Sequence, residues 1–262
     1  MVRFALPMYL LKALLPAQTR LRLRSYSWWA RGWFYQGKEV FCPLCEGHFQ
    51  KFLPFGVERR PQALCPKCHT LERHRLLWLY LQEQVQVETQ QLSVLHMAPE
   101  PVLQEKLKRL PNLQYRSADL SSPLAMDKVD IQRLPYADAS FDLILCSHVL
   151  AHVPDEKLAL QELSRVLKPK GRLLLQARIF LDLPQTLEEA DVATPQQRLK
   201  AHGQADRFRK YGLDFSERVS AQGFAVSPVD YAQTRTSQEQ QHLGLGQQEI
   251  IFVATPSAHV PA

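Results

Sequence analysis

Glycine is absent from the middle of this sequence, with none between Gly56 and Gly171. The loops that cradle nucleotide phosphates, G-x-x-x-x-G-K-[ST] and G-x-G-x-x-G, need several glycines so that the backbone can approach the phosphates. The absence excludes a P-loop nucleotidase over this stretch and argues against an ordinary dinucleotide-binding enzyme.

Long apolar runs are also absent. No stretch reaches the ~20 consecutive apolar residues that a membrane-spanning helix requires. The nearest candidate, Phe4–Leu15, contains Lys12 and Pro7. A signal peptide is one interpretation of this segment, and a short amphipathic surface helix is the one that we favour. We expect a cytoplasmic protein, with peripheral attachment to a membrane as an open alternative.

The composition suffices for a folded core, since 45% of the 262 residues are hydrophobic and 22% are charged. This length allows one full domain and a small annex. The net charge of +6 is concentrated near the N-terminus, where residues 1–80 carry 13 basic and four acidic side chains.

Residues 1–40 form a basic arm that is interleaved with aromatic side chains. Its members include Arg20, Arg22, Arg24, Arg31, Trp28, Trp29, Trp33, Phe34 and Tyr35. Such a segment suits binding to nucleic acid or to an anionic membrane surface, and it equally suits packing onto the body of the protein. The sequence leaves these three alternatives open.

Cysteine is scarce, with five in the chain, yet four of them form one pattern. Cys42-Pro-Leu-Cys45 and Cys65-Pro-Lys-Cys68 are separated by 19 residues, a spacing typical of a four-cysteine zinc site. Four thiolates leave no open coordination position, so we expect a structural and not a catalytic Zn²⁺. The alternative ligands are three neighbouring histidines, His48, His69 and His74.

The chain divides by composition into five expected segments. They are the arm at residues 1–40, a zinc ribbon at 41–70, a linker helix at 71–91, a large domain at 92–256 and a tail at 257–262.

Apolar strand patterns alternate with helical patterns in the large domain. We expect strands at residues 92–98, 113–120, 141–146 and 172–179, with a helix at 102–110 between the first two. Short connections between alternating strands and helices predict a doubly wound α/β fold with a mostly parallel sheet. Cys146 falls in an apolar strand and is expected to pack as a small hydrophobic side chain.

A second helix is expected to begin at Asp155 and to end within residues 168–171. Its expected buried face carries Leu158, Ala159, Leu163, Val166 and Leu167. Residues 224–231 and 249–254 have strand patterns with no helix-length apolar pattern between them. We therefore expect them to form an antiparallel pair that closes one edge of the sheet.

Three stretches of the large domain resemble the class I S-adenosylmethionine-dependent methyltransferases. These stretches are residues 130–142 (DIQRLPYADASFD), 146–155 (CSHVLAHVPD) and 162–172 (ELSRVLKPKGR). The zinc ribbon, the turn Ala98-Pro99-Glu100, residues 203–206 and Tyr211-Gly212 resemble, more narrowly, bacterial methyltransferases with an N-terminal cysteine ribbon. The resemblance covers residues 92–255 and implies a Rossmann-like sheet of seven strands with S-adenosylmethionine as cofactor.

By this resemblance the cofactor lies at the carboxyl ends of the strands. Asp119 would accept hydrogen bonds from the ribose hydroxyls, Asp130 with Ile131 would bind the adenine edge, and Ser147 with His148 would line the methionine end. The full set of implied cofactor residues is His96, Ala98, Glu100, Asp119, Asp130, Ile131, Ser147 and His148. An ordinary surface carboxylate at Asp119 and a loop cap at Asp130 are the alternatives.

The first loop departs from the usual pattern of this family, because Met97-Ala98-Pro99-Glu100 stands where a glycine-rich turn is usual. Alanine and proline are expected to avoid the positive φ angles that glycine offers. The sequence therefore predicts a different backbone path around the cofactor.

We expect the molecule that receives the methyl group to bind beside residues 202–212. This segment carries acidic, basic and hydrogen-bonding side chains between two glycines. We expect this segment to cover the methyl group, and the predicted catalytic residues are His148, Asp206, Arg209 and Tyr211. His152 and His202 are further candidates for a general base. The alternative is that Arg209 and Tyr211 only attach the last strands to the sheet. Arg207 stands where the narrower family commonly has a histidine.

Two classes of function remain open on the sequence alone. The first is methyl transfer from S-adenosylmethionine to an unidentified acceptor, which is RNA, protein or a saccharide. The second is a non-catalytic zinc-ribbon module that binds nucleic acid or a membrane surface, with a methyltransferase-like domain that only senses cofactor.

Overall fold

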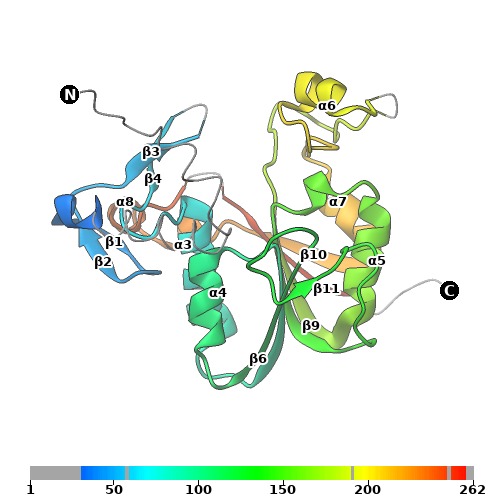
Figure 1. Ribbon diagram of the computed structural model, residues 1–262, viewed down its shortest axis with the longest axis horizontal. Helices are drawn as coiled ribbons and strands as arrows, with labels where there is room; N and C mark the ends of the chain where they lie inside the picture. Colours follow the sequence, from blue (N-terminus) through cyan, green and yellow to red (C-terminus); the bar gives the residue numbers. More distant parts are fainter. Residues whose placement is uncertain (1–30, 57–58, 190–191, 247–248, 258–262) are drawn as a thin grey trace, which may run out of the picture.

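A seven-stranded sheet forms the centre of the computed structural model, which describes residues 31–56, 59–189, 192–246 and 249–257 (Figure 1). Its parallel strands are β5 (Leu92–Met97), β6 (Leu113–Asp119), β7 (Asp127–Lys128), β8 (Phe141–Ser147) and β9 (Leu167–Gln176). Two antiparallel strands, β10 (Phe224–Val229) and β11 (Ile251–Pro256), complete the order β10-β11-β9-β8-β5-β6-β7. The prediction of a mostly parallel seven-stranded sheet with an antiparallel pair at one edge is confirmed.

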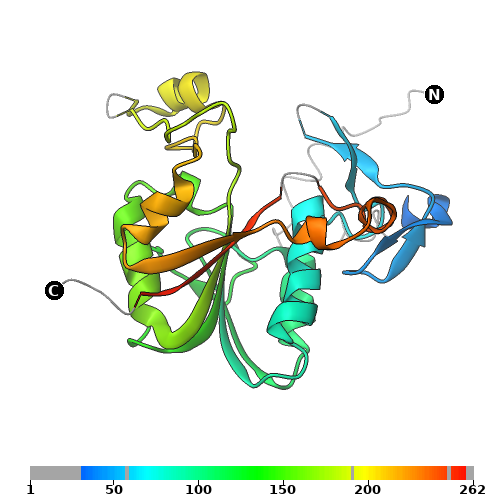
Figure 2. The same cartoon turned by 180° about the vertical axis from the view of Figure 1, so that it is seen from behind.

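Helices cover both faces of the sheet (Figures 1 and 2). On one face lie α3 (Glu72–Tyr80) and α4 (Pro101–Lys108), and on the other lie α5 (Glu156–Val166) and α7 (Phe215–Ser220). Successive side chains of β8 alternate between the two cores, as a pleated strand requires. Leu143 and Leu145 pack on the α3 side, whereas Ile144 and Cys146 pack on the α5 side. Cys146 is 2% exposed, as expected for a small hydrophobic side chain.

The cysteine ribbon consists of two short antiparallel hairpins beside α3. The first pairs β1 (Gln36–Cys42) with β2 (Gly47–Phe49), and the second pairs β3 (Leu53–Phe55) with β4 (Arg60–Leu64). Helix α3 follows the ribbon and continues as the π-helical segment η1 (Leu81–Val85). Core side chains of the ribbon, α3 and one face of the sheet form a single cluster.

Two predictions for α5 were wrong: Leu158 is not buried, and the helix ends before residues 168–171. Asp155 caps this helix as predicted, because its carboxylate accepts a hydrogen bond from the backbone N–H of Leu158 at 3.0 Å. Leu158 is 43% exposed, however, and Leu160 takes the buried position. Strand β9 begins directly at Leu167, where the backbone turns to an extended conformation. Residues 168–171 therefore belong to the strand, and a β-bulge opposite β8 accommodates them.

Two helical segments that apolar periodicity did not predict connect β10 to β11. They are η3 (Tyr231–Thr234) and α8 (Ser237–Leu243). Helix α8 buries none of its residues, which is why the sequence shows no apolar stripe there. A capping box between Thr236 and Glu239 defines its start instead, and Gly244 in the left-handed conformation ends it.

Two smaller helices are η2 (Leu150–His152), between β8 and α5, and α6 (Pro195–His202), between β9 and α7. Of the predicted arm and tail, residues 1–30 and 258–262 lie outside the described residues. The predicted segment boundaries stay predictions. Within the described residues, no helix has the length and apolar character needed to cross a bilayer.

The buried guanidinium of Arg75 connects the ribbon, α3 and the segment after α8. It is fully buried and donates hydrogen bonds to the backbone carbonyls of Thr70 at 2.9 Å, Ala63 at 3.0 Å and Leu243 at 3.0 Å. It also donates to the carbonyl of Gly244, and it stacks 3.9 Å from the centre of the Phe52 ring. A Cβ atom at Gly244 would lie 2.3 Å from that ring, so only glycine fits this close approach.

Replacing Arg75 with methionine should therefore destabilise the protein by about 3 kcal/mol or more. The aliphatic stem would be kept, but several buried carbonyls would lose their donor, and each such loss costs about 1–3 kcal/mol. The measurement is the free energy of unfolding in denaturant. The control is Arg116→Met, which removes a 55%-exposed side chain 3.6 Å from Asp127 and should cost less than about 1 kcal/mol. Equal losses in the two variants would contradict this role for Arg75.

Candidate functional site

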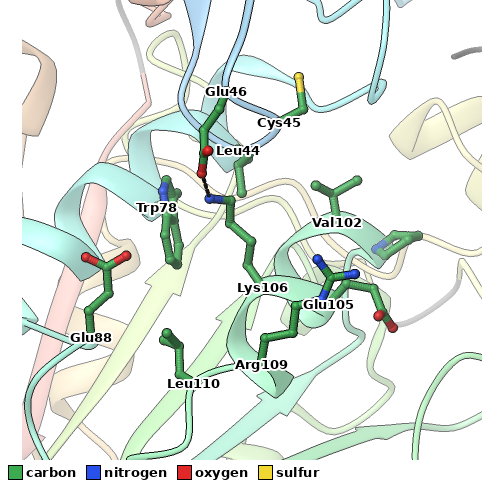
Figure 3. A pocket seen from close by; sticks show the side chains of 11 residues that line it. Leu44, Cys45, Glu46, Trp78, Glu88, Val102, Glu105, Lys106, Arg109 and Leu110 are labelled. Atoms are coloured by element: carbon green, nitrogen blue, oxygen red, sulfur yellow. Dashed lines mark hydrogen bonds and ion pairs between the residues drawn. The ribbon is translucent and has the colours of Figure 1, made fainter.

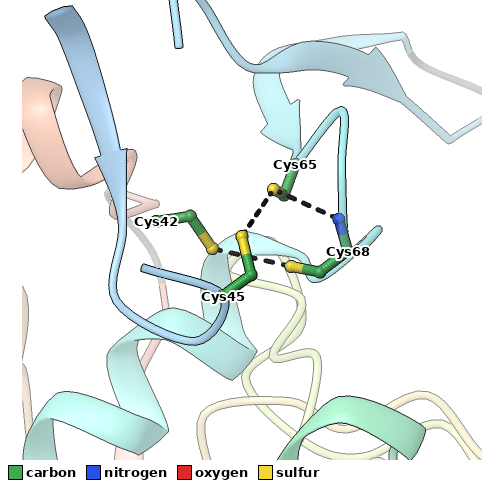
Figure 4. Close-up of side chains that lie close together, drawn as sticks. All are labelled: Cys42, Cys45, Cys65 and Cys68. Atoms are coloured by element: carbon green, nitrogen blue, oxygen red, sulfur yellow. Dashed lines mark hydrogen bonds between the residues drawn. The ribbon is translucent and has the colours of Figure 1, made fainter. Parts of the chain in front are cut away.

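Four cysteine sulfur atoms meet between the two hairpins of the ribbon (Figure 4). All four lie within 4.8 Å of one another, with Cys42 Sγ 3.6 Å from Cys68 Sγ and Cys45 Sγ 3.7 Å from Cys65 Sγ. A tetrahedral Zn²⁺ with Zn–S bonds of about 2.3 Å places its sulfur ligands about 3.8 Å apart. The donor set therefore fits zinc, and all four cysteines are free of disulfide bonds.

The four thiols lie close enough together to shift one another's pKa. Hydrogen bonding to Cys42 raises the pKa of Cys45 and of Cys68, and burial raises the pKa of Cys65. Four thiolates so close together need a cation to balance their charge. The Thr70 hydroxyl lies 3.1 Å from Cys68 Sγ, where it can donate to a thiolate ligand.

Histidine takes no part in this group of donors. Among the described residues, the close donor atoms come from the four cysteines and from none of His48, His69 and His74. The His48 ring packs 4.8 Å from the Phe41 ring, and His74 faces the carboxyl end of β5 instead.

The predicted cofactor residues gather where β5, β6 and β8 end. Ala98 directly follows β5 with φ of +48°, and its N–H donates to the carbonyl of Ala118 at 2.8 Å. His148 directly follows β8 with φ of +56°, and its N–H donates to the carbonyl of Gln176 at 2.7 Å. The expectation that alanine would avoid positive φ was wrong, because this bond to the neighbouring strand holds the strained turn.

Glu100 belongs to a buried network at the end of β5. His96 is fully buried and lies between Glu100 Oε2, 2.9 Å from its Nε2, and the Tyr115 hydroxyl, 2.9 Å from its Nδ1. His74 Nε2 lies 3.6 Å from the other carboxylate oxygen. Burial acts to raise the pKa of Glu100, but the His96 hydrogen bond together with the charges of His74 and His96 outweighs it and brings this pKa to about 2. The carboxylate is therefore ionised and paired with protein groups on both sides.

The two predicted aspartates both hold their own loops. Asp119 Oδ1 accepts from the backbone N–H groups of Ser121 at 2.7 Å and Ser122 at 2.6 Å. Asp130 Oδ1 accepts from the N–H of Gln132 at 2.9 Å. Asp119 is half-buried and Asp130 is exposed, while Ile131 is 5% exposed. These hydrogen bonds hold each carboxylate in place. They fit the alternatives given above, an ordinary surface carboxylate at Asp119 and a loop cap at Asp130.

Gln176, at the end of β9, is a site residue that sequence reasoning missed. Its side chain accepts a hydrogen bond from the Ser147 hydroxyl at 2.9 Å and donates to the backbone carbonyl of Arg73 at 3.3 Å. It thus links the ends of β8 and β9 to α3. Its position directly after an apolar strand was the available signal.

Arg209 and Tyr211 lie deeper than the sequence predicted, each only 1% exposed. The Arg209 guanidinium donates to the backbone carbonyls of Leu150, Val153 and Pro154, and it pairs with Glu188. The Tyr211 ring packs 4.6 Å from the Phe215 ring. As placed, the Arg209 side chain supports the loop after β8, and the Tyr211 ring packs against α7.

Asp206 and His152 form an accessible pair above this loop. His152 Nδ1 lies 3.3 Å from a carboxylate oxygen of Asp206, and their side chains are 31% and 78% exposed. His148, by contrast, has a buried Nε2 without a hydrogen-bond partner in the described part of the chain. Burial lowers the pKa of His148 to about 3, which keeps its imidazole neutral.

These side chains border one hollow where β8 and β9 end. Its lining includes His148, His152, Gln176, Arg178 and Arg207. Asp206 adjoins it through His152, and Arg209 and Tyr211 also line it.

A larger cavity of about 560 Å³ lies elsewhere, between the ribbon and α4 (Figure 3). Lys106 reaches across it, with Nζ 2.6 Å from Glu46 and 4.9 Å from the centre of the Trp78 ring. Of the predicted site residues, its lining includes only Cys45. This cavity is therefore separate from the edge of the sheet that carries the other predicted residues.

Comparison with known proteins shows that the central segment is similar to methyltransferases. Residues 88–175 match the family model described as a methyltransferase domain. The 27-O-demethylrifamycin SV methyltransferase of Amycolatopsis mediterranei (strain S699) is 32% identical over 87 residues, covering 33% of this chain and 32% of that protein. Methyltransferase GfsG of Streptomyces halstedii is 42% identical over 62 residues, covering 24% of this chain and 22% of that protein.

Among solved structures, Burkholderia thailandensis 1,6-didemethyltoxoflavin-N1-methyltransferase, with bound 1,6-didemethyltoxoflavin and S-adenosylhomocysteine, has a TM-score of 0.47 and 15% identity. The alignment covers 71% of this chain and 78% of that chain. The chain spans about a third or less of the length of the two curated relatives. Residues 88–175 are therefore similar to a methyltransferase domain, and this finding does not favour the non-catalytic alternative.

Purified protein should contain one Zn²⁺ per chain, held by the four cysteines. Cys65→Ser should lower the zinc content and the melting temperature, because the charge of the remaining thiolates loses its compensation. Cys146→Ala is the control and should keep its zinc. Metal analysis and thermal unfolding measure both effects. A fully folded preparation that holds no metal would contradict the site.

Acid should destabilise the protein through His74. Burial lowers the pKa of His74 to about 4, and Nδ1 must stay unprotonated to accept the Leu71 N–H at 3.2 Å. Because the folded pKa lies below the usual 6.5, the stability that this group contributes is present above pH 6.5 and is lost as the pH falls toward 4.

Between pH 7.5 and pH 5 this loss amounts to about 2 kcal/mol. His74→Gln keeps an acceptor at the third helical position but cannot titrate, so it should lose about 2 kcal/mol less than the natural protein. Denaturant unfolding at the two pH values measures the difference, and identical losses in both proteins would refute the argument.

Proposed function

We propose that this protein transfers a methyl group from S-adenosylmethionine to an acceptor that enters the hollow where β8 and β9 end. The observation that carries the proposal is the methyltransferase-domain match over residues 88–175, which contains the strands β5, β6 and β8. In open α/β sheets, ligands bind outside the carboxyl ends of the strands where the strand order reverses. That point lies between β5 and β8 in this sheet.

The residues at this point suit the cofactor. Asp119 offers an ionisable carboxylate that two serine N–H groups hold in place, and it would accept from the ribose hydroxyls. Asp130 and Ile131 would contact the adenine, and Ser147 with His148 would contact the methionine end. The cofactor supplies a methyl group on a sulfonium, so the protein mainly has to align the acceptor with it.

His152 is the better placed general base of the two histidines in the hollow. Asp206 beside Nδ1 orients the ring, which leaves Nε2 to take the proton of an oxygen or nitrogen acceptor. The buried, neutral His148 would instead hydrogen-bond the reacting groups. In this proposal Arg209 is a positioning residue that holds the loop carrying His152, and Tyr211 lines the hollow.

The remaining parts of the chain would support this reaction. We propose that the ribbon holds one structural Zn²⁺, and that the arm at residues 1–40 engages the acceptor. The acceptor would be RNA, protein or a saccharide, and an anionic membrane surface is a further candidate partner of the arm. A cytoplasmic protein, free or peripheral at the membrane, and a bacterial family type remain part of the proposal.

Calorimetry with S-adenosylhomocysteine tests the cofactor site. Asp119→Ala should weaken binding at least about tenfold, which is about 1.4 kcal/mol, because a hydrogen bond to a charged group is lost. The control is Asp138→Asn, which changes a 77%-exposed carboxylate shortly before the start of β8, away from the strand ends.

Radiolabelled S-adenosylmethionine with fractionated cell extract tests the reaction itself, and His152→Gln should lower labelling without changing cofactor affinity. Absence of cofactor binding by the natural protein would refute the proposal.

A further inference from the structure

The charge of Arg75 has no acidic partner beside it. Its guanidinium is fully buried, and every hydrogen bond that it donates goes to a backbone carbonyl, which is an uncharged acceptor. Within the described residues no carboxylate forms an ion pair with it. Glu72, whose negative charge favours the charged form of Arg75, pairs instead with Arg60 at 3.1 Å. A buried charge is costly unless an opposite charge compensates it, so a negative group is expected nearby.

The four-cysteine cluster lies one residue away from this guanidinium. The Thr70 carbonyl accepts hydrogen bonds from Arg75 Nη1 at 2.9 Å and from the N–H of Cys65 at 2.9 Å. The Thr70 hydroxyl lies 3.1 Å from Cys68 Sγ and 3.5 Å from Cys42 Sγ. A single residue thus touches Arg75 on one side and the cysteines on the other, so the guanidinium lies directly behind the cluster.

The cysteines also supply the negative charge that acts on Arg75. Burial lowers the pKa of Arg75, and thiolates at Cys42 and Cys65 raise it. Both cysteines are 0% exposed, so water does little to screen this attraction. Four thiolates outweigh the charge of one Zn²⁺, which leaves the loaded site negative. The zinc–thiolate group would therefore provide the compensation that Arg75 otherwise lacks.

Other cations around the ribbon are more exposed or already paired. Lys67 is half-buried, and its Nζ lies 3.5 Å from the carbonyl of Cys45. Lys106, from α4, pairs with Glu46, whose side chain is 71% exposed. Water and salt weaken the effect of such charges on a buried group. Arg75 is therefore the cation best placed to stabilise the loaded site.

We propose that Arg75 is the counter-charge of the zinc–thiolate group, so that zinc binding and the attachment of residues 243–244 to the ribbon stabilise each other. The inference rests on the zinc site of the proposed function. The same guanidinium donates to the carbonyls of Leu243 and Gly244, which follow the ligands by more than 170 positions in the chain. Coupling between two binding events is reciprocal, so loosening either contact of Arg75 should weaken the other.

Zinc affinity of the folded full chain, measured by competition with a chromophoric chelator, tests the counter-charge. Arg75→Met should weaken zinc binding at least about tenfold, which corresponds to about 1.4 kcal/mol. Arg75→Lys keeps the charge but loses the planar fork, so it should stay within about threefold of the natural protein. A purely structural role predicts equal losses in the two variants, because both disrupt the bonds to the carbonyls.

Arg60→Met is the matched control for charge. It removes another guanidinium of the ribbon, one that is 40% exposed and that pairs with Glu72. Because this charge is compensated and solvated, the variant should bind zinc like the natural protein.

Gly244→Ala tests the coupling from the opposite end. A Cβ atom there would lie 2.3 Å from the Phe52 ring and 2.8 Å from Arg75 Nη2, so the guanidinium would have to move. This variant should weaken zinc binding at least about threefold, although no ligand is changed. The control is Gly203→Ala, which also places alanine at a positive φ after a helix but meets nothing within 4 Å. It should keep the natural affinity.

The possible failures are distinguishable. If the natural protein binds no zinc, the proposed zinc site fails and the inference fails with it. If zinc binds with equal affinity to the natural protein and to Arg75→Met, the inference is wrong while the zinc site stands. Should Arg75→Met not fold, tenfold weaker binding by Arg75→Lys, or natural affinity in Gly244→Ala, would overturn the inference.

Discussion

The guanidinium of Arg75 is the interaction on which the arrangement of the whole molecule depends. Its donors satisfy carbonyl groups that come from the second hairpin of the ribbon, from the residue before α3 and from the end of α8. Backbone carbonyls buried in this way would otherwise cost about 1–3 kcal/mol each. Because α3 also packs on the sheet, this one side chain fixes the ribbon and the C-terminal segment relative to the strands that carry the site.

The candidate site is built on backbone strain at two neighbouring strand ends. Ala98 and His148 both adopt positive φ angles directly after β5 and β8, and each is held by a hydrogen bond to the next strand. Such conformations cost about 1–3 kcal/mol each and persist where the surrounding structure determines them. Here the buried pair of His96 and Glu100 on one side, and the Ser147–Gln176 bond on the other, supply that constraint. The turn thus reaches without glycine a conformation that glycine usually provides.

The two halves of the proposed reaction differ in how their residues come together. The candidate cofactor residues lie at the ends of consecutive strands, so the parallel sheet alone aligns them. The hollow that the proposed acceptor enters is lined by His152 from η2, Arg178 after the end of β9 and Arg207 from a distant loop. Variation in those segments can change the acceptor without disturbing the cofactor edge, which is consistent with a fold that serves many substrates.

The sequence by itself determined the alternation of strands and helices in the central domain, the Asp155 cap and the four-cysteine cluster. Each follows from local chemistry, namely apolar runs, a capping carboxylate and fixed thiol spacing. Only the tertiary structure decided the rest. Leu160 replaces Leu158 in the core because the sheet lies on that side of α5, and Arg209 is buried because the loop after β8 presents three carbonyls to it. A charged side chain looks exposed in a sequence, since its partners here are backbone groups that folding alone assembles.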